Sequence, residues 1–557
     1  MTPLFHADFW RARWRALGPW LERPAAVRVA VGASLLIPLF FAFYTRLAWE
    51  DFLITYRFSE NLARGHGLVY TPGEHVYGFT SPLNALLPAL FAWLTGASDY
   101  TVPLWLFRLV SLAGLAAALT AVARLFTAEH AAPSPGYYAG LLFPLLAVLE
   151  IKTTAFSMSG QEAGLVLGFL GPAFALAYRN WPGRAVLGGV LWAGLMYSRP
   201  DAFVYIAALA GAALAFAPQG RRDLVRAFLK SAAVCALLYL PWFLFTWTYY
   251  GSPVPHTVVA KFGVEGIPNS AWSLTTSLVG GLRKAPDVLT TILAPVYDLL
   301  DGSVGTWPAW THDVELLLAL VAVLYWLLPT RDRLGRMASL FSFLVCGYLL
   351  YASAVAQFAP WYYPPLAFTS LLTLVCAALT ATGSLRRVRV ARGVAALAGA
   401  ALVGFLGYLF TTSLVPLRID QEVIEWGNRR LIGLWLKDHV ARGEAVYLEP
   451  LGYIGYYSQC KMLDWPGLVA PEVVAARRTL STRLGYTWLE TAEVLKPRWI
   501  VARGFEAMLM SKSPTLAPQY ELMRVFDVSD RVRAAPVRPG MRFVYAEVAY
   551  GVFRRRP

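Results

Sequence analysis

Cysteine is scarce in this sequence, with 4 cysteines among 557 residues. Cys235, Cys346 and Cys376 lie inside apolar runs, and Cys460 stands alone. A disulfide framework needs paired cysteines, and a cysteine zinc site needs several at short spacing. We therefore expect neither. A divalent cation is left open, since no ligand cluster of convincing spacing stands out.

Charge is also scarce: 15% of residues are charged and 57% are hydrophobic. Such a composition is too apolar for a soluble globular protein and indicates a polytopic α-helical membrane protein. The net charge of +15 comes mostly from short arginine clusters between apolar runs. Membrane orientation explains such clusters better than nucleic acid does, so we expect no nucleic-acid partner.

Apolar runs of about twenty residues recur along the chain, a length that crosses about 30 Å of hydrocarbon. We expect about eleven transmembrane helices, at residues 28–47, 100–124, 137–155, 163–178, 185–198, 202–217, 231–248, 313–328, 337–353, 366–383 and 394–412. Basic clusters precede the first run and follow the second, fourth, sixth, eighth and tenth. All of them then lie on one side of the membrane, which the positive-inside rule makes cytoplasmic.

This orientation divides the chain into three parts. Residues 1–27 form a cytoplasmic arm, and the first apolar run lacks a small-residue cleavage site, so we expect a retained anchor. Residues 28–413 form the membrane domain, with a first outer loop at 48–99. The run at 83–95 is only thirteen residues long. Spanning there would invert every later loop, so we expect it to be re-entrant or interfacial.

Residues 414–557 differ from the membrane domain in charge and pattern. Strand-like "EAVYLEP" and "PRWIVAR" alternate with helix-like "RRLIGLWLKDHVARG" and "VVAARRTLSTRL". Proline and glycine separate these segments, as is typical of an α/β domain. We expect an extracytoplasmic α/β domain there.

Two carboxylates, Glu50 and Asp51, follow the first apolar run. Carboxylates at a helix end can simply mark the water interface. Alternatively, one is a general base that deprotonates an acceptor hydroxyl at the membrane surface. The two residues alone do not decide between these readings.

The whole loop, "EDFLITYRFSENLARGHGLVYTPGEHVYGFTSPL", resembles the first outer loop of the GT-C glycosyltransferases that use polyprenyl-phosphate sugars. The resemblance is strongest to the branch with the mycobacterial terminal β-(1→2) arabinofuranosyltransferase. It implies that the acidic pair is catalytic, with Asp51 the base. It also implies substrate contacts for Tyr56 and Arg57 in "ITYR".

Three later segments are similar to family motifs in the same order. "SMSGQEAGL" (157–165) keeps the acidic position as Glu162, although Gln161 and Ala163 depart from the pattern. "YSRPDAF" (197–203) and "YYGSPVPHTVVAKF" (249–262) follow. The resemblance implies substrate or donor-phosphate contacts for Glu162, Arg199, Asp201, His256 and Lys261.

A lipid phosphate needs cations near the outer ends of the spans, and Lys152 is a further candidate. Each cation has a structural alternative: Lys152 snorkels to the interface, His256 is a satisfied loop histidine, or Arg199 only pairs with Asp201.

The resemblance implies an inverting membrane glycosyltransferase on the outer face of a bacterial cytoplasmic membrane. The donor would be a polyprenyl-phosphate sugar, with arabinofuranose favoured over mannose or another hexose. The acceptor would be a cell-envelope glycan or protein. The alternatives are a lipid or solute transporter, and a scaffold that binds the lipid donor without turnover.

Overall fold

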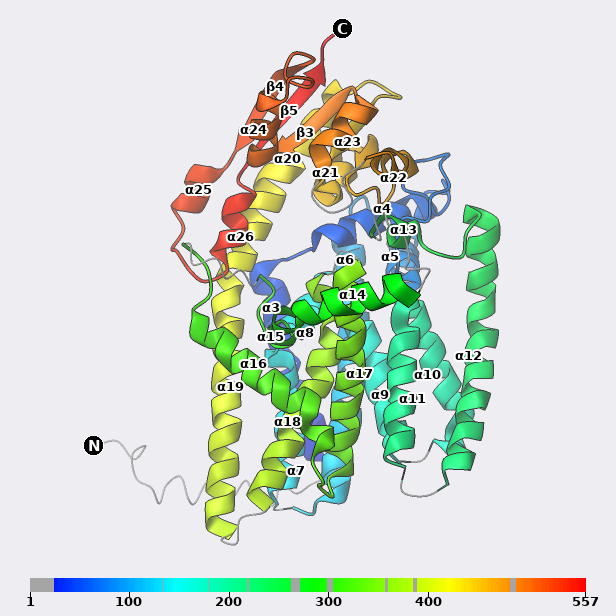
Figure 1. Cartoon of the computed structure of the whole chain (residues 1–557), viewed down its shortest axis with the longest axis vertical. Helices are drawn as coiled ribbons and strands as arrows, with labels where there is room; N and C mark the ends of the chain where they lie inside the picture. The colour runs from blue at the N-terminus through cyan, green and yellow to red at the C-terminus, as the bar shows by residue number, and fades with distance from the viewer. Residues whose placement is uncertain are drawn as a thin grey trace, which may run out of the picture.

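The structure is a computed structural model of the chain (Figure 1). It describes residues 25–132, 134–179, 181–217, 220–261, 271–297, 304–355, 359–383, 388–480 and 487–557. Most of the expected cytoplasmic arm lies outside these ranges. So does part of the segment between residues 250 and 309.

A bundle of apolar helices forms the larger part of the molecule, and a small sheet domain lies at one end of it (Figure 1). The bundle helices are α2 (Ala25–Ser34), α3 (Leu36–Thr45), α6 (Thr101–Glu129), α7 (Pro135–Leu149), α8 (Ile151–Met158), α9 (Ala163–Arg179), α10 (Ala185–Ser198), α11 (Phe203–Ala215), α12 (Arg221–Tyr250), α16 (Ala309–Leu324), α17 (Arg333–Val355), α18 (Pro364–Gly383) and α19 (Val388–Ile419). Each of the eleven expected spans lies largely within one of these helices or a consecutive pair.

Fewer helices have the length and composition of a membrane span than the sequence predicts. In the described residues, seven helices are long and apolar enough to cross a membrane, or eight if the bent pair α7 and α8 is one span. The angle between α7 and α8 is 63°. Helices α9 and α11 are apolar but shorter, so the expected count of eleven is not confirmed.

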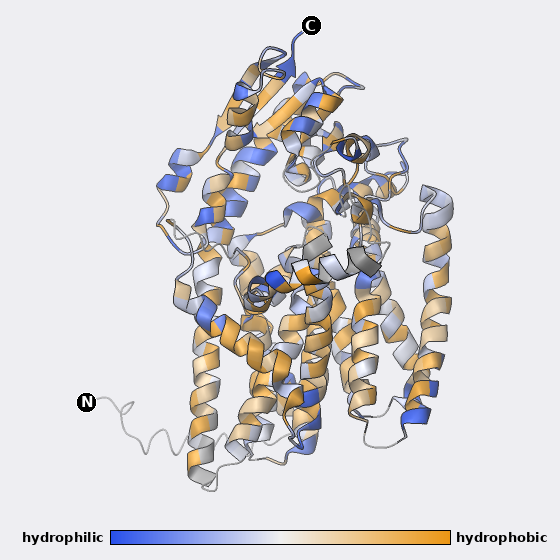
Figure 2. Cartoon of the chain, viewed as in Figure 1, coloured by the Kyte–Doolittle hydropathy of each residue, from blue (hydrophilic) through white to orange (hydrophobic). Residues whose placement is uncertain are grey.

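Basic residues gather at the ends of the helices that lie far from the sheet domain. Helix α12 begins at Arg221 and α17 begins at Arg333. Figure 2 shows these lower helix ends as hydrophilic and the middle of the bundle as hydrophobic. The sheet domain and the basic helix ends therefore lie at opposite ends of the bundle.

The expected first outer loop contains two helices, α4 (Glu50–Ala63) and α5 (Pro82–Thr95). Ser81 caps α5, because its hydroxyl accepts a hydrogen bond from the Asn84 N–H at 3.2 Å. Helix α5 has 14 residues and is therefore about 21 Å long at 1.5 Å per residue. That length is too short to cross the hydrocarbon core, as the sequence indicates for 83–95.

The C-terminal part is an α/β domain, which confirms the expected class. Its five-stranded sheet has the order β2-β1-β3-β5-β4. Strand β1 is parallel to β2 and β3, and β5 is antiparallel to β3 and β4. The strands are β1 (Ala445–Leu448), β2 (Lys461–Asp464), β3 (Trp499–Arg503), β4 (Tyr520–Asp527) and β5 (Ala549–Arg555).

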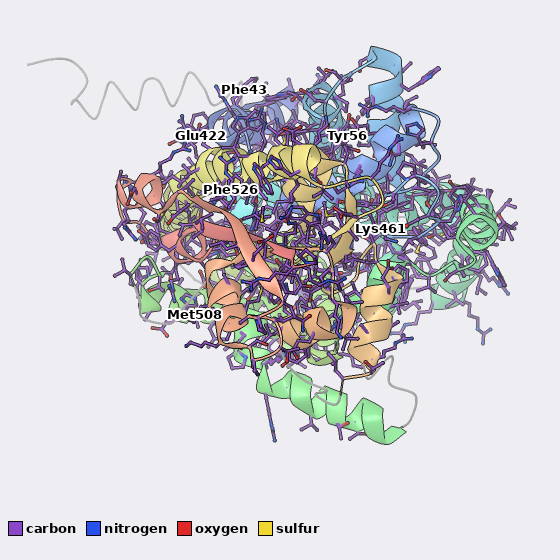
Figure 3. The ribbon with its side chains drawn as sticks, turned by 90° about the horizontal axis from the view of Figure 1, so that it is seen from above. Phe43, Tyr56, Glu422, Lys461, Met508 and Phe526 are labelled. Carbon is purple, nitrogen blue, oxygen red and sulfur yellow. The ribbon has the colours of Figure 1, made fainter. Side chains whose placement is uncertain are left out.

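Short helices surround this sheet and connect it to the bundle. They are α20 (Arg430–His439), α21 (Leu451–Ser458), α22 (Pro471–Arg478), α23 (Trp488–Leu495), α24 (Gly504–Lys512), α25 (Ser529–Arg533) and α26 (Met541–Ala546). Seen from above, the domain lies over the centre of the bundle (Figure 3). Shorter helices α13 (His256–Lys261), α14 (Ala271–Arg283) and α15 (Ala285–Thr290) lie between α12 and α16 in the chain.

The expected boundary between residues 413 and 414 falls inside helix α19. Helix α19 runs on through a π-helical segment, η6 (Asp420–Arg429), into α20. The Arg430 N–H donates to the Glu425 carbonyl, five residues earlier, as a π-helix requires. The chain therefore enters the C-terminal domain without a linker. Sequence composition changes near 414 because the helix leaves the apolar bundle, not because it ends.

Candidate functional site

Two adjoining cavities lie between the C-terminal domain and the end of the bundle that faces it. The main cavity has a volume of about 590 Å³ and is lined by α4, α15, residues 359–363, η6 and the C-terminal domain. The small pocket has a volume of about 50 Å³ and is lined by α4, residues 78–81, the first turn of α5, Gln161, Glu162 and α13. Asp51 and Trp361 are the two residues that line both cavities.

Asp51 lies in the first turn of α4, beside Glu50. A carboxylate is favoured in the first helical turn, so helix capping explains part of this placement. However, no hydrogen bond or ion pair holds the Asp51 carboxylate in the described chain. The pKa of Asp51 is raised to about 7, mainly by burial; Lys261 opposes this rise, and Glu50 and Glu162 add to it. A carboxylate with that pKa can act as a general base near neutral pH.

Glu50 has a different environment from Asp51. Its carboxylate forms an ion pair with Arg429 at 3.0 Å and accepts a hydrogen bond from the Gly452 N–H at 3.1 Å. A Cβ atom at residue 452 would collide with Glu50, so only glycine allows α21 to approach this closely. The C-terminal domain therefore fixes Glu50, whereas Asp51 has no such partner.

Arg429 lies at the centre of a buried charge cluster. Besides Glu50, it binds Glu425 at 2.5 Å and Glu547 at 2.7 Å. Arg503 binds Glu547 at 2.9 Å and also pairs with Glu449. All six of these residues line the main cavity.

Burial and the two arginines shift the pKa values of the surrounding carboxyl groups in opposite directions. Burial alone would raise the pKa of Glu547, but Arg429 and Arg503 outweigh burial and lower it to about 2. Glu449 differs: burial raises its pKa to about 7, against the effect of Arg503. The wall that the C-terminal domain contributes to the cavity therefore carries carboxyl groups that differ in their tendency to be protonated.

Lys261 is the cation of the small pocket. Its ammonium lies 5.8 Å from the ring centroids of Trp361 and Tyr362. Among the described residues, no carboxylate lies within ion-pair distance of it. Lys284 lines the main cavity and donates to the Ser353 carbonyl at 2.6 Å. Both ammonium groups thus keep capacity for an anionic ligand.

Arg199, Glu162 and Asp201 come together, as their motifs suggested, but they bind one another. Arg199 pairs with Glu162 at 2.5 Å and with Asp201 at 2.9 Å, and its guanidinium stacks on Tyr362 at 4.0 Å. Only Glu162 of the three lines the small pocket. This arrangement matches the alternative in which Arg199 serves as an ion-pair partner.

The remaining expected residues lie outside the linings of both cavities. Lys152 is fully buried, 3.3 Å from Glu150, and donates to the Ala294 carbonyl. The Tyr56 hydroxyl donates to the Asp99 carbonyl at 3.0 Å. Arg57 donates to the Gly455 and Cys460 carbonyls at 2.8 and 3.0 Å. These contacts anchor α8, α4 and α21. The substrate contacts expected for Lys152, Tyr56 and Arg57 stay predictions.

His256 begins α13, and its backbone N–H donates to the Tyr77 carbonyl at 2.8 Å. Burial and the nearby Arg478 lower its pKa, which favours the neutral imidazole. A neutral histidine is a weaker ligand for phosphate than a lysine, so Lys261 is the better candidate.

Several cavity residues were not expected from the sequence. Arg429, Glu449, Arg503 and Glu547 come from the C-terminal domain or its connecting helix, and Lys284 comes from the segment before α15. They are far from the loop motif in the sequence and have no distinctive spacing. Only the fold brings them to Asp51.

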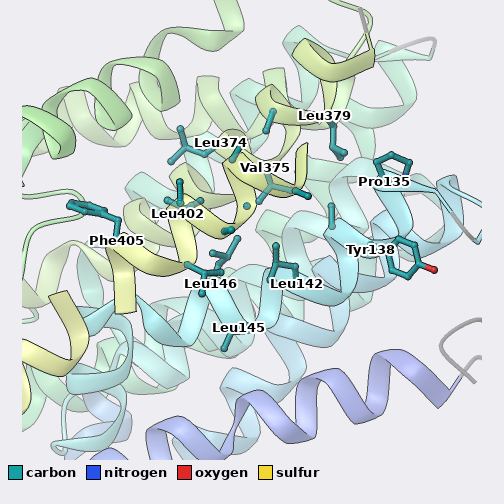
Figure 4. Close-up of a pocket in the computed structure, with 18 of the residues that line it drawn as sticks. Pro135, Tyr138, Leu142, Leu145, Leu146, Leu374, Val375, Leu379, Leu402 and Phe405 are labelled. Atoms are coloured by element: carbon teal, nitrogen blue, oxygen red, sulfur yellow. The ribbon is translucent and has the colours of Figure 1, made fainter. Parts of the chain in front are cut away.

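A third, apolar cavity of about 970 Å³ lies among α7, α16, α18 and α19 (Figure 4). It is lined by residues such as Leu142, Leu374, Val375 and Leu402, and it shares no lining residue with the two cavities at Asp51. Its lining suits an aliphatic chain rather than a reaction.

In the part of the chain that the structure describes, no group of three or more histidine, cysteine, aspartate or glutamate residues is arranged to hold a metal ion. A divalent cation is therefore not assigned to any residues, and its involvement stays open.

Comparisons with known proteins agree with the resemblance in the loop. The chain is 28% identical over 338 residues to a terminal β-(1→2)-arabinofuranosyltransferase of Mycobacterium tuberculosis, covering 53% of this chain and 51% of that protein. It is 27% identical over 262 residues to the protein of that name from Corynebacterium glutamicum, covering 43% and 37%. The chain thus spans about half or less of these relatives' length.

Solved structures share the fold at low sequence identity. An Archaeoglobus fulgidus oligosaccharyltransferase matches 90% of this chain and 72% of its own, with a TM-score of 0.51 and 13% identity. ArnT from Cupriavidus metallidurans in the apo state matches 95% and 97%, with the same TM-score and identity. These two matches confirm the expected GT-C type of fold.

The C-terminal part matches a separate family. Residues 419–545 match one described as "Domain of unknown function (DUF8728)". Its first residues include η6, which supplies Arg429 to the cavity. The chain is therefore similar in sequence to the terminal β-(1→2)-arabinofuranosyltransferases, has the GT-C type of membrane fold, and carries this second domain over its candidate site.

Proposed function

We propose that this protein is an inverting glycosyltransferase of the bacterial cytoplasmic membrane. It transfers an arabinofuranosyl group from a polyprenyl-phosphate donor to a hydroxyl of a cell-envelope glycan or protein. The observation that carries the proposal is Asp51, a carboxylate without a partner that lines two adjoining cavities. A base in that position reaches an acceptor in one cavity and a donor in the other.

The reaction is a single displacement. Asp51 takes the proton of the acceptor hydroxyl, and the acceptor oxygen attacks the anomeric carbon. The bond from that carbon to the phosphate oxygen breaks, and its electron pair leaves with the lipid phosphate. One displacement inverts the anomeric carbon and needs no covalent sugar–enzyme intermediate.

The other residues stabilise charge and geometry. Lys261, without a carboxylate partner, compensates the charge that develops on the leaving phosphate. Lys284, at the main cavity, is a second candidate for this role. Arg199 is a weaker candidate, because two carboxylates already satisfy it. Glu50 is a positioning residue that Arg429 holds beside the base.

The outer-face orientation is supported by the basic helix ends opposite the C-terminal domain. The choice of arabinofuranose follows the names of the curated relatives, and mannose or another hexose is the alternative donor sugar.

The test uses the full chain in nanodiscs with a labelled polyprenyl-phosphate arabinofuranose and arabinan oligosaccharides. We expect acceptor-dependent transfer of label with inverted anomeric configuration. Parallel reactions with polyprenyl-phosphate mannose decide the sugar. Donor binding without transfer to any acceptor would favour the scaffold, and movement of intact donor across the bilayer would favour a transporter. Either result would contradict the proposal.

A further inference from the structure

The backbone just before the acidic pair is held by the C-terminal domain. Residues 46–49 lie between α3 and α4 and belong to neither helix, so the backbone groups of Ala48 need partners from elsewhere in the chain. Ala48 is buried, and buried backbone groups are almost always hydrogen-bonded. The partners are Gln421 in η6 and Tyr453 in α21, a helix that lies against α4 (Figure 1).

Ala48, Gln421 and Tyr453 form a closed ring of hydrogen bonds, called here the Ala48 ring. The Ala48 N–H donates to Gln421 Oε1 at 2.8 Å, and Gln421 Nε2 donates to the Tyr453 hydroxyl at 2.9 Å. That hydroxyl donates to the Ala48 carbonyl at 3.2 Å and lies equally far from Gln421 Oε1. Both side chains are buried, so water does not compete for these bonds.

The residues on either side of Ala48 are fixed as well. The Trp49 N–H donates to the Ser159 carbonyl at 2.9 Å, and the Arg108 guanidinium donates to the Leu47 carbonyl at 2.7 Å. The chain that leads into α4 is therefore held at three consecutive residues. The C-terminal domain holds the middle one.

This backbone support matters most for Asp51, three residues further along the chain. Within the described residues, no group is bonded to the Asp51 carboxylate, so its position depends on how the start of α4 is held. A catalytic group must be held to within about 0.5 Å, and a displacement of about 1 Å can cost about 100-fold in rate. Gln421 and Tyr453 line neither cavity, so they can act on Asp51 only through the backbone.

We propose that Gln421 and Tyr453 are positioning residues, which aim Asp51 at the acceptor hydroxyl by fixing the backbone of Ala48. Both lie within residues 419–545, the part of the chain that matches a domain of unknown function. The C-terminal domain then takes part in catalysis by supporting the base, besides forming the ion pair with Glu50. This role rests on the proposed function, in which Asp51 is the base.

The test uses Tyr453→Phe and Gln421→Met, which remove bonds of the Ala48 ring with little change in side-chain volume. Each should lower kcat by at least about 5-fold and by up to about 100-fold, the cost of a displacement of about 1 Å. The donor and acceptor KM should stay within about 2-fold of wild type, because neither residue lines a cavity. The double variant should be little slower than the slower single variant, because both residues act through one ring.

The matched control is Tyr447→Phe in β1. Tyr447 is also fully buried and its hydroxyl donates to the Trp488 carbonyl at 2.8 Å, but it lines neither cavity. Tyr447→Phe and Tyr453→Phe each remove a buried hydrogen bond to a backbone carbonyl, so both should lower the melting temperature by a similar amount. Only Tyr453→Phe should lower kcat. Rates are divided by the number of donor-binding sites, so a poorly folded preparation still reports the turnover of its folded fraction.

The outcomes separate this positioning role from the proposed function. Wild-type protein that transfers no sugar would refute the function. Wild-type transfer with kcat within about 2-fold of normal in both ring variants would overturn the positioning role. An equal loss of kcat in Tyr447→Phe would overturn it too, because the loss would then reflect the stability of the domain. So would a raised acceptor KM with unchanged kcat, because Gln421 and Tyr453 would then serve acceptor binding.

Discussion

Asp51→Asn is the change that most directly tests the proposed chemistry. Asparagine keeps the size of the side chain and cannot accept the acceptor's proton. General acid–base catalysis typically contributes about 10²–10⁴-fold, so turnover should fall by at least that factor. Donor binding should largely survive, because Lys261 and the other residues that line the small pocket are unchanged.

The pKa of Asp51 also predicts how the transfer rate depends on pH. Asp51 must be deprotonated to act as a base, so wild-type kcat/KM should rise about tenfold per pH unit up to about pH 7 and then level off. Glu50 raises the pKa of Asp51 and Lys261 lowers it. Glu50→Gln should therefore move the midpoint to lower pH, and Lys261→Ala should move it to higher pH.

The same pKa predicts an effect on stability. In the folded protein the Asp51 pKa is raised from 3.8 to about 7, so the folded state binds more protons than the unfolded state between these values. As the pH rises across that window, the free energy of unfolding should fall by up to about 4 kcal/mol, because one pKa unit is worth about 1.4 kcal/mol. Asp51→Asn should remove this loss and raise the melting temperature at pH 8 relative to wild type. The difference should vanish near pH 4.

The assay measures initial transfer rates, donor affinity and melting temperature from pH 4 to 9 for wild type, Asp51→Asn and Glu50→Gln in one nanodisc preparation. Near-normal turnover in Asp51→Asn would refute the assignment of the base. A lower melting temperature of this variant at pH 8 would show that Asp51 is structurally satisfied, against the reasoning from its missing partners.

Three further perturbations test the remaining parts of the site. Lys261→Ala should weaken donor affinity by at least about tenfold, since charge-assisted contacts contribute about 1.5–3 kcal/mol, while unchanged affinity would remove it from phosphate binding. Arg429→Gln leaves several buried carboxylates uncompensated and should lower stability by about 3–5 kcal/mol, measured as a drop in melting temperature; an unchanged melting temperature would contradict the buried cluster. In a cysteine-free background, Met508→Cys should react with a membrane-impermeant thiol reagent in cells with a permeabilised outer membrane, and Arg222→Cys should not. Reversed labelling would refute the outer-face orientation.

The helices of the bundle could be predicted from the sequence because hydrophobic run length reflects burial in the bilayer directly. Two of the five strands of the C-terminal domain were also predictable, since "EAVYLEP" and "PRWIVAR" contain β1 and β3. The end of the membrane domain was not. A change in composition at 414 looks like a boundary, yet α19 continues because backbone hydrogen bonding does not depend on which solvent surrounds the helix.

The site was predicted in part. The motif led to Asp51, Glu50, Glu162 and Lys261, which the fold brings to adjoining cavities. The motif could not reveal that Arg199 already forms ion pairs with Glu162 and Asp201, because ion pairing depends on three-dimensional proximity. Nor could it reveal Arg429, whose partner Glu50 lies 379 positions away in the chain. Local patterns carry no information about such pairs.

The continuous helix from the bundle into the C-terminal domain limits how this protein can be rearranged in evolution or in the laboratory. A domain is usually exchanged at a flexible linker that few contacts cross. Here the junction is π-helical, and the segment η6 itself supplies Arg429 to the cavity wall. A swap at that point would have to preserve the helical phase as well as the charge pairing with Glu50. The two parts are therefore expected to be inherited as one unit, and a chimera joined at residue 414 should retain its fold only if both halves come from close relatives.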